Sequence, residues 1–297
     1  MGTSRTGFIG LGNMGGPMAG HLLTQSGALW VHDRTAEAVA PLAAQGAEVA
    51  QSPAEMAAGV DLVLTCLPDT EVVRAVLFGP EGVLAASRDG LLIVDCSTLD
   101  RADTLALAAE AAEAGASYCD CPISGALPGA RAGTLTSLFG GTAAQFERAR
   151  PVLEPFSAQV LHCGPVGSGQ AMKAINNILY NINIAALCEV LPMTVAAGLD
   201  PQIVATLVTT GSARSFAAEH FVPRILDRRF DTDFAMQSAY KDIVNVNRLA
   251  QETGANVPLV RAMTEAYEAA LRAGLGAEPK SAMIKLSEDA LGVEFKA

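Results

Sequence analysis

The sequence predicts an α/β domain with a doubly wound, mostly parallel sheet, followed by an all-α C-terminal domain. In the first half, short apolar runs alternate with alanine-rich stretches of helical length, and after residue 163 the strand signal stops. A chain of 297 residues is long enough for two domains with separate hydrophobic cores. We place the boundary in a turn-rich segment near residue 165, which gives domains of residues 1–165 and 166–297.

Several apolar runs of the first half are near-continuous, which is typical of strands that are covered on both faces. The predicted strands span residues 6–9, 29–32, 61–67, 91–96, 117–121, 134–139 and 159–163. The predicted helices between them span residues 14–23, 36–44, 52–58, 70–77 and 101–114. Alternation of this kind predicts a doubly wound sheet, because each crossover helix returns the chain to a parallel strand.

The second domain is predicted to open with a long apolar interdomain helix over residues 168–197, which ends at Gly198. Asp200 and Pro201 supply an N-cap and an N1 proline for the next helix. Further helical patterns span residues 213–227, 234–252, 258–273 and 280–286. A small helical domain cannot bury so much apolar surface within itself, so we expect a homodimer or a homotetramer.

The composition argues against several classes of partner. A formal net charge of −11 disfavours nucleic acid, because phosphate binding needs a basic face. The most apolar window contains polar residues and no signal-peptide pattern is visible, so we expect a cytoplasmic protein without a membrane partner. The six cysteines lack the paired spacing of a zinc site, so we expect no metal.

Three glycines follow the first predicted strand and open the first predicted helix. The first would make a tight turn, the second would let the backbone approach a pyrophosphate, and the third would let the helix pack on the strand. The phosphates would lie at the helix N-terminus, where free N–H groups favour anions. The pattern predicts a Rossmann-type dinucleotide site, and the alternative is that the glycines serve only a tight turn. The cofactor-binding residues predicted here are Gly10, Leu11, Gly12, Asn13, Met14 and Gly15.

The second predicted strand ends at Asp33, whose carboxylate can accept hydrogen bonds from ribose hydroxyls and so favours NAD. Arg34 beside it suits the 2′-phosphate of NADP, so both cofactors stay open, with NAD favoured. Loops after two later strands would complete the crevice, because sheets of this type bind ligands at that edge, although each loop also fits ordinary turn chemistry. The cofactor-binding residues predicted in these three places are Asp33, Arg34, Thr35, Leu67, Pro68 and Thr98.

A lysine and two amides begin the long apolar helix, in the stretch Lys173-Ala-Ile-Asn176-Asn177. Lys173 and Asn177 are four residues apart and share one helical face. The helix dipole does not favour a cation in the first turns, which supports a function for Lys173 over an ordinary lysine at a helix start. A positioned ammonium can stabilise and protonate the oxygen of a substrate that gains hydride, an effect of about 10² to 10⁴-fold.

Four separated motifs resemble the β-hydroxyacid dehydrogenase family, which includes 3-hydroxyisobutyrate dehydrogenase and tartronate semialdehyde reductase. Residues 7–19 resemble its dinucleotide signature, and Asp120-Cys-Pro-Ile-Ser124-Gly125 resembles its substrate-binding stretch. Residues 167–177 resemble its catalytic helix start, and Lys241-Asp242 resembles its late Lys-Asp pair. The resemblance covers essentially the whole chain.

The resemblance implies an oxidoreductase that transfers a hydride between NAD(P) and a small 3-hydroxy acid, 3-hydroxyisobutyrate-like, or its semialdehyde. It implies that Lys173 is the catalytic lysine at the substrate oxygen and that Asn177 holds the same region of the substrate. It also implies that Ser124 and Gly125 bind the substrate carboxylate and that Lys241 lies near the nicotinamide end of the cofactor.

One position departs from the family pattern, because Ala126 stands where a second glycine is usual, and its methyl group would reshape the substrate pocket. Two alternatives to this function stay open. An imine reductase or reductive aminase would use the same fold, although such enzymes usually lack the lysine at the catalytic position. A non-catalytic dinucleotide-binding scaffold would keep the fold without turnover, although the intact Lys173, Asn177 and Ser124 argue against it.

Overall fold

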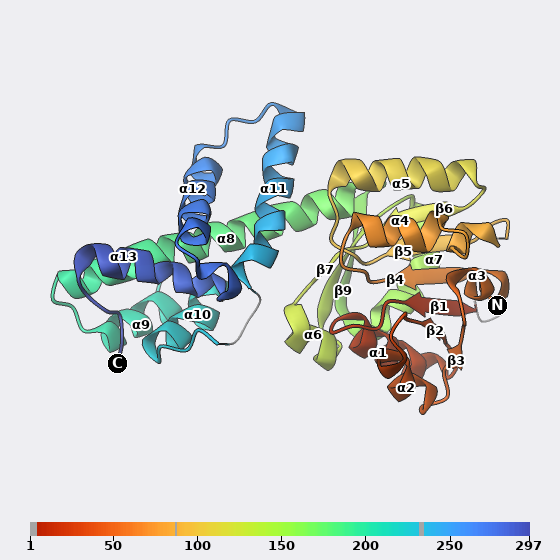
Figure 1. Cartoon of the computed structure of the whole chain (residues 1–297), viewed down its shortest axis with the longest axis horizontal. Coiled ribbons are helices and arrows are strands. Elements are labelled where there is room, and N and C mark those ends of the chain that lie inside the picture. The colour runs from red at the N-terminus through yellow and green to blue at the C-terminus, as the bar shows by residue number, and fades with distance from the viewer. Residues whose placement is uncertain (1–4, 87, 232–234) are drawn as a thin grey trace. The chain divides into compact units, whose positions relative to one another are not determined.

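The aliphatic runs of the first half form one sheet in the computed structural model, which describes residues 5–86, 88–231 and 235–297. The chain divides into two compact units, Met1–Lys173 and Ala174–Ala297. The sheet belongs to the first unit, and the second unit is helical (Figure 1). The predicted fold class is therefore confirmed.

Among the described residues the sheet has nine strands, in the order β3-β2-β1-β4-β5-β6-β8-β7, with β9 paired to β8. The strands are β1 (Thr6–Ile9), β2 (Trp30–His32), β3 (Glu48–Val49), β4 (Leu62–Thr65), β5 (Leu92–Asp95), β6 (Ser117–Asp120), β7 (Ile123–Ser124), β8 (Leu135–Gly140) and β9 (Ser157–Gly164). Every predicted strand is present. The sequence pattern does not indicate β3 and β7, because strands of two residues are too short to show periodicity.

The strand order reverses next to β1. The chain passes outward from β1 through β2 to β3 and then returns to form β4 on the other side of β1. The pairs from β3 through to β6 are all parallel, whereas β8 runs antiparallel to β6 and β7. Ligands of such sheets bind outside the carboxyl ends of the strands at the point of reversal, which here lies between β1 and β4.

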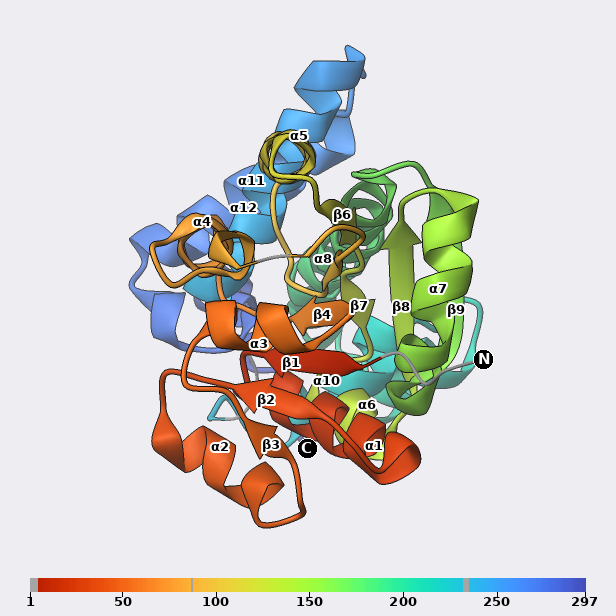
Figure 2. The same ribbon diagram turned by 90° about the vertical axis from the view of Figure 1, so that its right-hand side faces the viewer.

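Helices cover both faces of this sheet (Figure 2). The helical segments are α1 (Gly15–Ser26), α2 (Ala36–Ala43), α3 (Pro53–Gly59), α4 (Thr70–Phe78), η1 (Val83–Ala85), α5 (Arg101–Glu113), α6 (Ala126–Ala132), α7 (Ala143–Leu153) and η2 (Glu154–Phe156). Neighbouring residues of β1 face the two halves of the core. Phe8 belongs to a cluster with α1, α2 and α7, and Ile9 belongs to a cluster with α3, α4 and α5.

The sequence pattern does not indicate α6 and α7. Thr142 and Gln145 form a capping box at the start of α7, so a sequence signal for this helix exists, whereas Pro151 interrupts its pattern. Helix α6 begins at Ala126, directly after Gly125, and both of these residues have a positive φ. Composition does not indicate that an alanine will adopt a left-handed conformation, so the sequence does not predict the start of α6.

The second unit is helical along its described residues. Its helical segments are α8 (Ser168–Ala196), which begins in the first unit, α9 (Pro201–Thr210), α10 (Phe216–Leu226), α11 (Met236–Thr253), α12 (Pro258–Arg272), η3 (Leu275–Ala277), η4 (Lys280–Met283) and α13 (Ile284–Leu291). The predicted start of a helix at residue 234 lies outside the described residues. The last predicted helix, over residues 280–286, begins as a 3-10 turn and continues further, to a left-handed C-cap at Gly292.

The longest helix, α8, is apolar over most of its length. Its length and its hydropathy of 1.5 would allow it to cross a membrane, although a core helix of a soluble protein passes the same test. Lys173, Asn177 and Asn181 repeat at a spacing of four residues and form a polar row along it. The helix is therefore amphipathic, with a polar row on a mostly apolar surface.

Candidate active site

The glycine-rich loop after β1 has an unusual backbone. Gly10 has a φ of 93°, and a Cβ there would overlap the backbone oxygen of Cys66, in the loop after β4. A Cβ on Gly15 would overlap the Gly10 oxygen, so glycine is required for α1 to lie this close to the strand. A Cβ on Gly12 would meet no atom within 4 Å. The backbone of Gly12 therefore faces open space at the point where the strand order reverses.

The N-terminus of α1 can receive an anion. Met14, which precedes the helix, makes no side-chain capping hydrogen bond, and the first turn contains no acidic residue. Gly12 and Asn13 beside it are exposed. The backbone N–H groups and the positive end of the helix dipole therefore favour a phosphate at this position.

Asp33 is held against the glycine-rich loop. Its Oδ2 accepts a hydrogen bond from the N–H of Leu11 at 2.7 Å, and its Oδ1 accepts one from the N–H of Thr35 at 2.8 Å. The half-buried carboxylate is thus fixed beside the loop, while Arg34 and Thr35 are exposed. The end of β2 and the glycine-rich loop after β1 therefore lie side by side, joined by the bond between Asp33 and Leu11.

A buried hydrogen-bond network joins the ends of β4 and β5 to each other and to Tyr118 of β6. The fully buried Asp95 accepts a hydrogen bond from the hydroxyl of Thr65 at 2.8 Å and from that of Tyr118 at 2.6 Å. Burial raises the pKa of Tyr118 well above its ordinary value, so its phenol remains a donor. Asp95 also accepts from the N–H of Ser97 at 3.0 Å, and the Ser97 hydroxyl accepts from the N–H of Leu67 at 2.8 Å. The network fixes both later loops that were predicted to contact a cofactor.

Asp120 holds the start of α8 against the end of β6. Its fully buried carboxylate accepts hydrogen bonds from the N–H of Gly167 at 2.6 Å and from that of Gln170 at 2.8 Å. The Gln170 side chain accepts from the N–H of Leu99 at 3.1 Å and donates to the oxygen of Ser97 at 2.8 Å. The first turn of α8 is therefore attached to the ends of both β5 and β6. Composition and motif spacing did not indicate a role for Gln170.

Gly169 shows how closely α8 approaches the sheet. A Cβ there would overlap the backbone oxygen of Leu138 and would lie 3.1 Å from Pro122, just before β7. The half-buried Lys173 follows four residues later and so lies on the same face of the helix. The attachment of the first turn therefore determines where Lys173 stands in the next turn.

Ser124 ends β7 and is followed by two residues with positive φ. Gly125 has a φ of 128° and Ala126 has a φ of 52°. Ser124 is half-buried and pairs with Thr136 of β8, which fixes its direction. A left-handed alanine costs about 1–2 kcal/mol, because its Cβ crowds the backbone. The residue that departs from the family pattern is thus accommodated by backbone strain next to the predicted carboxylate site.

Asn177 is bonded to an acidic residue within the second unit. Its Nδ2 donates to the Oδ2 of Asp242 at 2.8 Å, and Asp242 is buried in α11. Lys241, next to it, is exposed. The sequence singled out Asp242 only as part of a pair, and its contact with Asn177 identifies it as a positioning residue for that amide.

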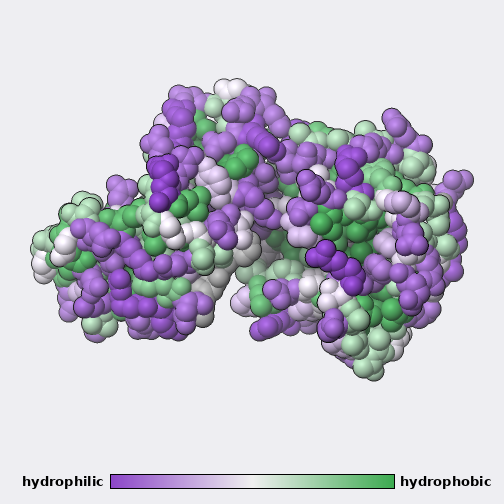
Figure 3. Space-filling view, viewed as in Figure 1, coloured by the Kyte–Doolittle hydropathy of each residue, from purple (hydrophilic) through white to green (hydrophobic). Residues whose placement is uncertain are grey.

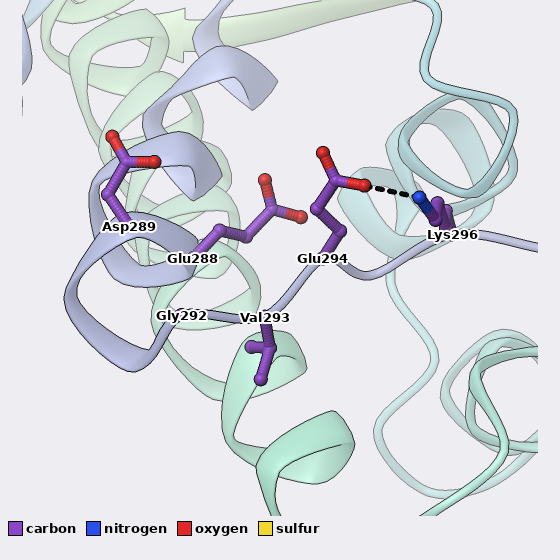
Figure 4. Close-up of a pocket in the computed structure, with 6 residues that line it drawn as sticks. All are labelled: Glu288, Asp289, Gly292, Val293, Glu294 and Lys296. Atoms are coloured by element: carbon purple, nitrogen blue, oxygen red, sulfur yellow. Dashed lines mark hydrogen bonds and ion pairs between the residues drawn. The ribbon is translucent and has the colours of Figure 1, made fainter.

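A surface depression near the C-terminus has a different character (Figure 4). Its lining residues are Glu288, Asp289, Gly292, Val293, Glu294 and Lys296. It contains none of the predicted site residues, and its acidic side chains would repel a carboxylate substrate. Along the residues that the structure describes, no group of three or more His, Cys, Asp or Glu side chains is placed to hold a metal ion.

Two family models match consecutive parts of the chain. Residues 5–164 match the NAD-binding domain of 6-phosphogluconate dehydrogenase, and residues 167–287 match the NAD-binding model of NADP-dependent 3-hydroxyisobutyrate dehydrogenase. The 2-(hydroxymethyl)glutarate dehydrogenase of Eubacterium barkeri is 38% identical over 97% of this chain and 96% of its own length.

Solved structures show the same similarity in three dimensions. The 3-hydroxyisobutyrate dehydrogenase of Mycobacterium tuberculosis, solved with L-serine, has a TM-score of 0.85 and 32% identity over 96% of this chain and 99% of its own. An imine reductase of Myxococcus stipitatus, solved with NADP⁺, has a TM-score of 0.61 and 21% identity over 95% of this chain and 99% of its own. The imine reductase therefore shares the fold alone.

The protonation of Asp120 provides a test of the attachment of α8. Burial raises the pKa of Asp120 from 3.8 to about 6, although the N–H groups of Gly167 and Gln170 oppose this shift. Between about pH 4 and 6 the folded protein holds a proton that the unfolded chain has lost. The contribution of this group to stability is therefore full below about pH 4 and is lost as the pH rises through 6, by up to about 3 kcal/mol.

Urea unfolding of the wild type and of Asp120→Asn at pH 4 and at pH 7 measures this contribution. The amide resembles the protonated carboxyl, so the free energy of unfolding of the variant relative to the wild type should increase at the higher pH. A difference that is the same at both pH values would contradict the expected titration.

Proposed function

The chain belongs to the β-hydroxyacid dehydrogenase family, and on this basis we propose that it transfers a hydride between NAD(P) and a small 3-hydroxy acid or its semialdehyde. The observation that carries the proposal is the buried attachment of α8 through Asp120 and Gln170. It fixes the turn that bears Lys173 at the carboxyl edge of the sheet, the same edge at which the glycine-rich loop lies.

In this proposal, residues 1–165 provide the dinucleotide site and residues 166–297 the remainder of the substrate site. The glycine-rich loop from Gly10 to Gly15 would hold the pyrophosphate, and Asp33 would accept hydrogen bonds from the ribose. We propose NAD as the preferred cofactor, because the fixed Asp33 carboxylate would repel a 2′-phosphate, although Arg34 beside it would tolerate one. When bound, the cofactor supplies or accepts the hydride at its nicotinamide ring. Further contacts with it are proposed for Thr35, Leu67, Pro68, Thr98 and Lys241.

Lys173 is proposed to act at the reacting oxygen. In reduction its ammonium donates a hydrogen bond to the carbonyl oxygen and then gives it a proton, and in oxidation the neutral amine takes that proton back. Ser124 and Gly125 would bind the substrate carboxylate. Asn177 would hold the region of the substrate near Lys173, with its amide oriented by Asp242.

The second unit supports a homo-oligomer. Ile175, Leu179, Val190 and Met193 are about half exposed and lie on one face of α8, since they are four, eleven and three residues apart. Ile203 and Leu207 of α9 are still more exposed, and Figure 3 shows apolar patches among the polar surface of this unit. The stripe is about 27 Å long at 1.5 Å per residue.

We propose that a second copy of the chain covers this stripe. Monomers rarely expose more than a few hundred Å² of contiguous apolar surface. With its flanking side chains the stripe offers on the order of 800 Å², the area that each partner buries in a stable dimer. In this view the apolar residues of α8 face protein rather than lipid, which agrees with a cytoplasmic enzyme.

Turnover with a panel of substrates tests the proposed function. The purified protein is given NAD or NADP with short 3-hydroxy acids, and a cyclic imine is offered with each reduced cofactor, while the absorbance of the reduced nicotinamide is followed. We expect oxidation of at least one 3-hydroxy acid, with a higher kcat/KM for NAD than for NADP. Turnover of the imine alone, or cofactor binding without any turnover, would contradict the proposal.

Lys173→Ala is expected to retain cofactor binding and to lose at least about 10²-fold in kcat, because the substrate oxygen no longer meets a proton donor. Cofactor binding is measured by fluorescence titration and kcat by absorbance. Lys296→Ala removes an exposed lysine that forms an ion pair with Glu294, and it serves as the matched control. Retention of turnover in Lys173→Ala would remove this lysine from the mechanism.

The double variant Leu179→Glu with Val190→Glu should convert the oligomer to a monomer, because two carboxylates would have to be buried at the interface. Light scattering after size-exclusion chromatography gives the mass in solution. Leu105→Glu, which adds a charge to α5 outside the stripe, should keep the mass of the wild type. A monomeric wild type, or a double variant that stays oligomeric, would refute the proposed interface.

A further inference from the structure

Two polar side chains meet in the interior of the second unit. Asn181 of α8 is fully buried, and Lys280 of η4 is only 7% exposed. The Nζ of Lys280 donates to the Oδ1 of Asn181 at 2.7 Å and lies 4.7 Å from the centre of the Tyr180 ring. The hydroxyl of Tyr267 donates to the same oxygen at 3.3 Å. An ammonium is thus held inside the unit, although burying a charge is costly.

The other end of the Asn181 amide is unsatisfied. Its Nδ2 is buried and has no hydrogen-bond partner, and across the described residues it is the one buried side-chain nitrogen or oxygen in this state. The amide cannot be reversed to relieve this, because Lys280 and Tyr267 both donate and therefore require an oxygen where Oδ1 stands. A buried N–H without an acceptor is destabilising, so an acceptor group that enters here would gain a hydrogen bond that the folded chain leaves unmade.

The position of Asn181 relates this cluster to the proposed active site. Lys173, Asn177 and Asn181 follow one another at a spacing of four residues and share a face of α8. Four residues, about 6 Å along the helix axis, separate Asn177 from Asn181, and a short carbon chain spans that distance. In the proposed function Ser124 and Gly125 hold the first carboxylate of the substrate. A substrate group that bonds to Asn181 would then be distinct from this first carboxylate.

We propose that Lys280 and Asn181 form a subsite for a second carboxylate, so that the substrate class is a 3-hydroxy acid with two carboxylates joined by a short chain. This inference rests on the function proposed above. An ammonium beside an amide N–H suits a carboxylate, because one oxygen takes a charge-assisted hydrogen bond and the other takes the unused N–H. Lys280 is then a specificity-determining residue; the Tyr180 ring lies against its ammonium, and Tyr267 positions the Asn181 amide.

The test compares two substrates that differ in the distal group. 2-(Hydroxymethyl)glutarate carries the second carboxylate, and 2-(hydroxymethyl)pentanoate has a methyl group in its place. The ratio of their kcat/KM values is measured for the wild type, Lys280→Met and Lys280→Arg with the preferred cofactor. Lys285→Met is the matched control, because Lys285 lies on the next helix and pairs with Glu278.

We expect the wild type to prefer the dicarboxylate and Lys280→Met to lower the ratio at least tenfold, through a higher KM for the dicarboxylate, since a charge-assisted hydrogen bond is worth about 1.5–3 kcal/mol. Lys280→Arg should recover part of the ratio, and Lys285→Met should leave it unchanged. If Lys280→Met does not fold, as judged by circular dichroism, the ratio is measured for Asn181→Ser, for which a fall is also expected.

The possible outcomes distinguish a failure of this inference from a failure of the proposed function on which it rests. A wild type that oxidises the monocarboxylate at least as well as the dicarboxylate would overturn the second subsite and leave the proposed function standing. The second subsite would also be overturned if Lys280→Met lowered kcat/KM equally for both substrates, because loss of a purely structural lysine would have that effect. A wild type that oxidises neither these two substrates nor any other 3-hydroxy acid would overturn the proposed function itself.

Discussion

The carboxylate of Asp120 is the constraint on which the rest of the proposed site depends. It accepts two backbone N–H groups from the beginning of α8, and the side chain of Gln170 ties the same turn to the loop after β5. Gly169 makes this possible, because any side chain there would collide with Leu138. Once this first turn is fixed, the position of Lys173 in the next turn follows from hydrogen bonds in which Lys173 takes no part.

The parts of the site that could be predicted from the sequence are those with local causes. The glycine-rich loop is recognisable because the backbone conformation of Gly10 and the close packing at Gly15 both exclude side chains. The polar network behind it has no such signal. Thr65 and Asp95 are 30 residues apart and Ser97 and Gln170 are 73 apart, so their contacts depend on the strand order and on where α8 begins.

The same distinction applies in the second unit. The spacing predicts that Lys173 and Asn177 share one helical face, and this prediction does not extend the row to Asn181, four residues further on. Its contact with Lys280, 99 residues further along the chain, was not visible, because Lys280 reads as an ordinary lysine near a helix start. In the first unit, α6 belongs to this category too, since its first residue, Ala126, has a left-handed conformation that an L-residue rarely adopts.

Asp33 has a fixed orientation, because each of its carboxylate oxygens accepts a backbone N–H. A carboxylate offers about four lone-pair sites, so two of them remain free to accept ribose hydroxyls. Immobilising a flexible side chain on binding usually costs about 0.5–1.5 kcal/mol of conformational entropy. At Asp33 this entropy is lost when the chain folds, so the adenosine half of a dinucleotide meets a preorganised acceptor.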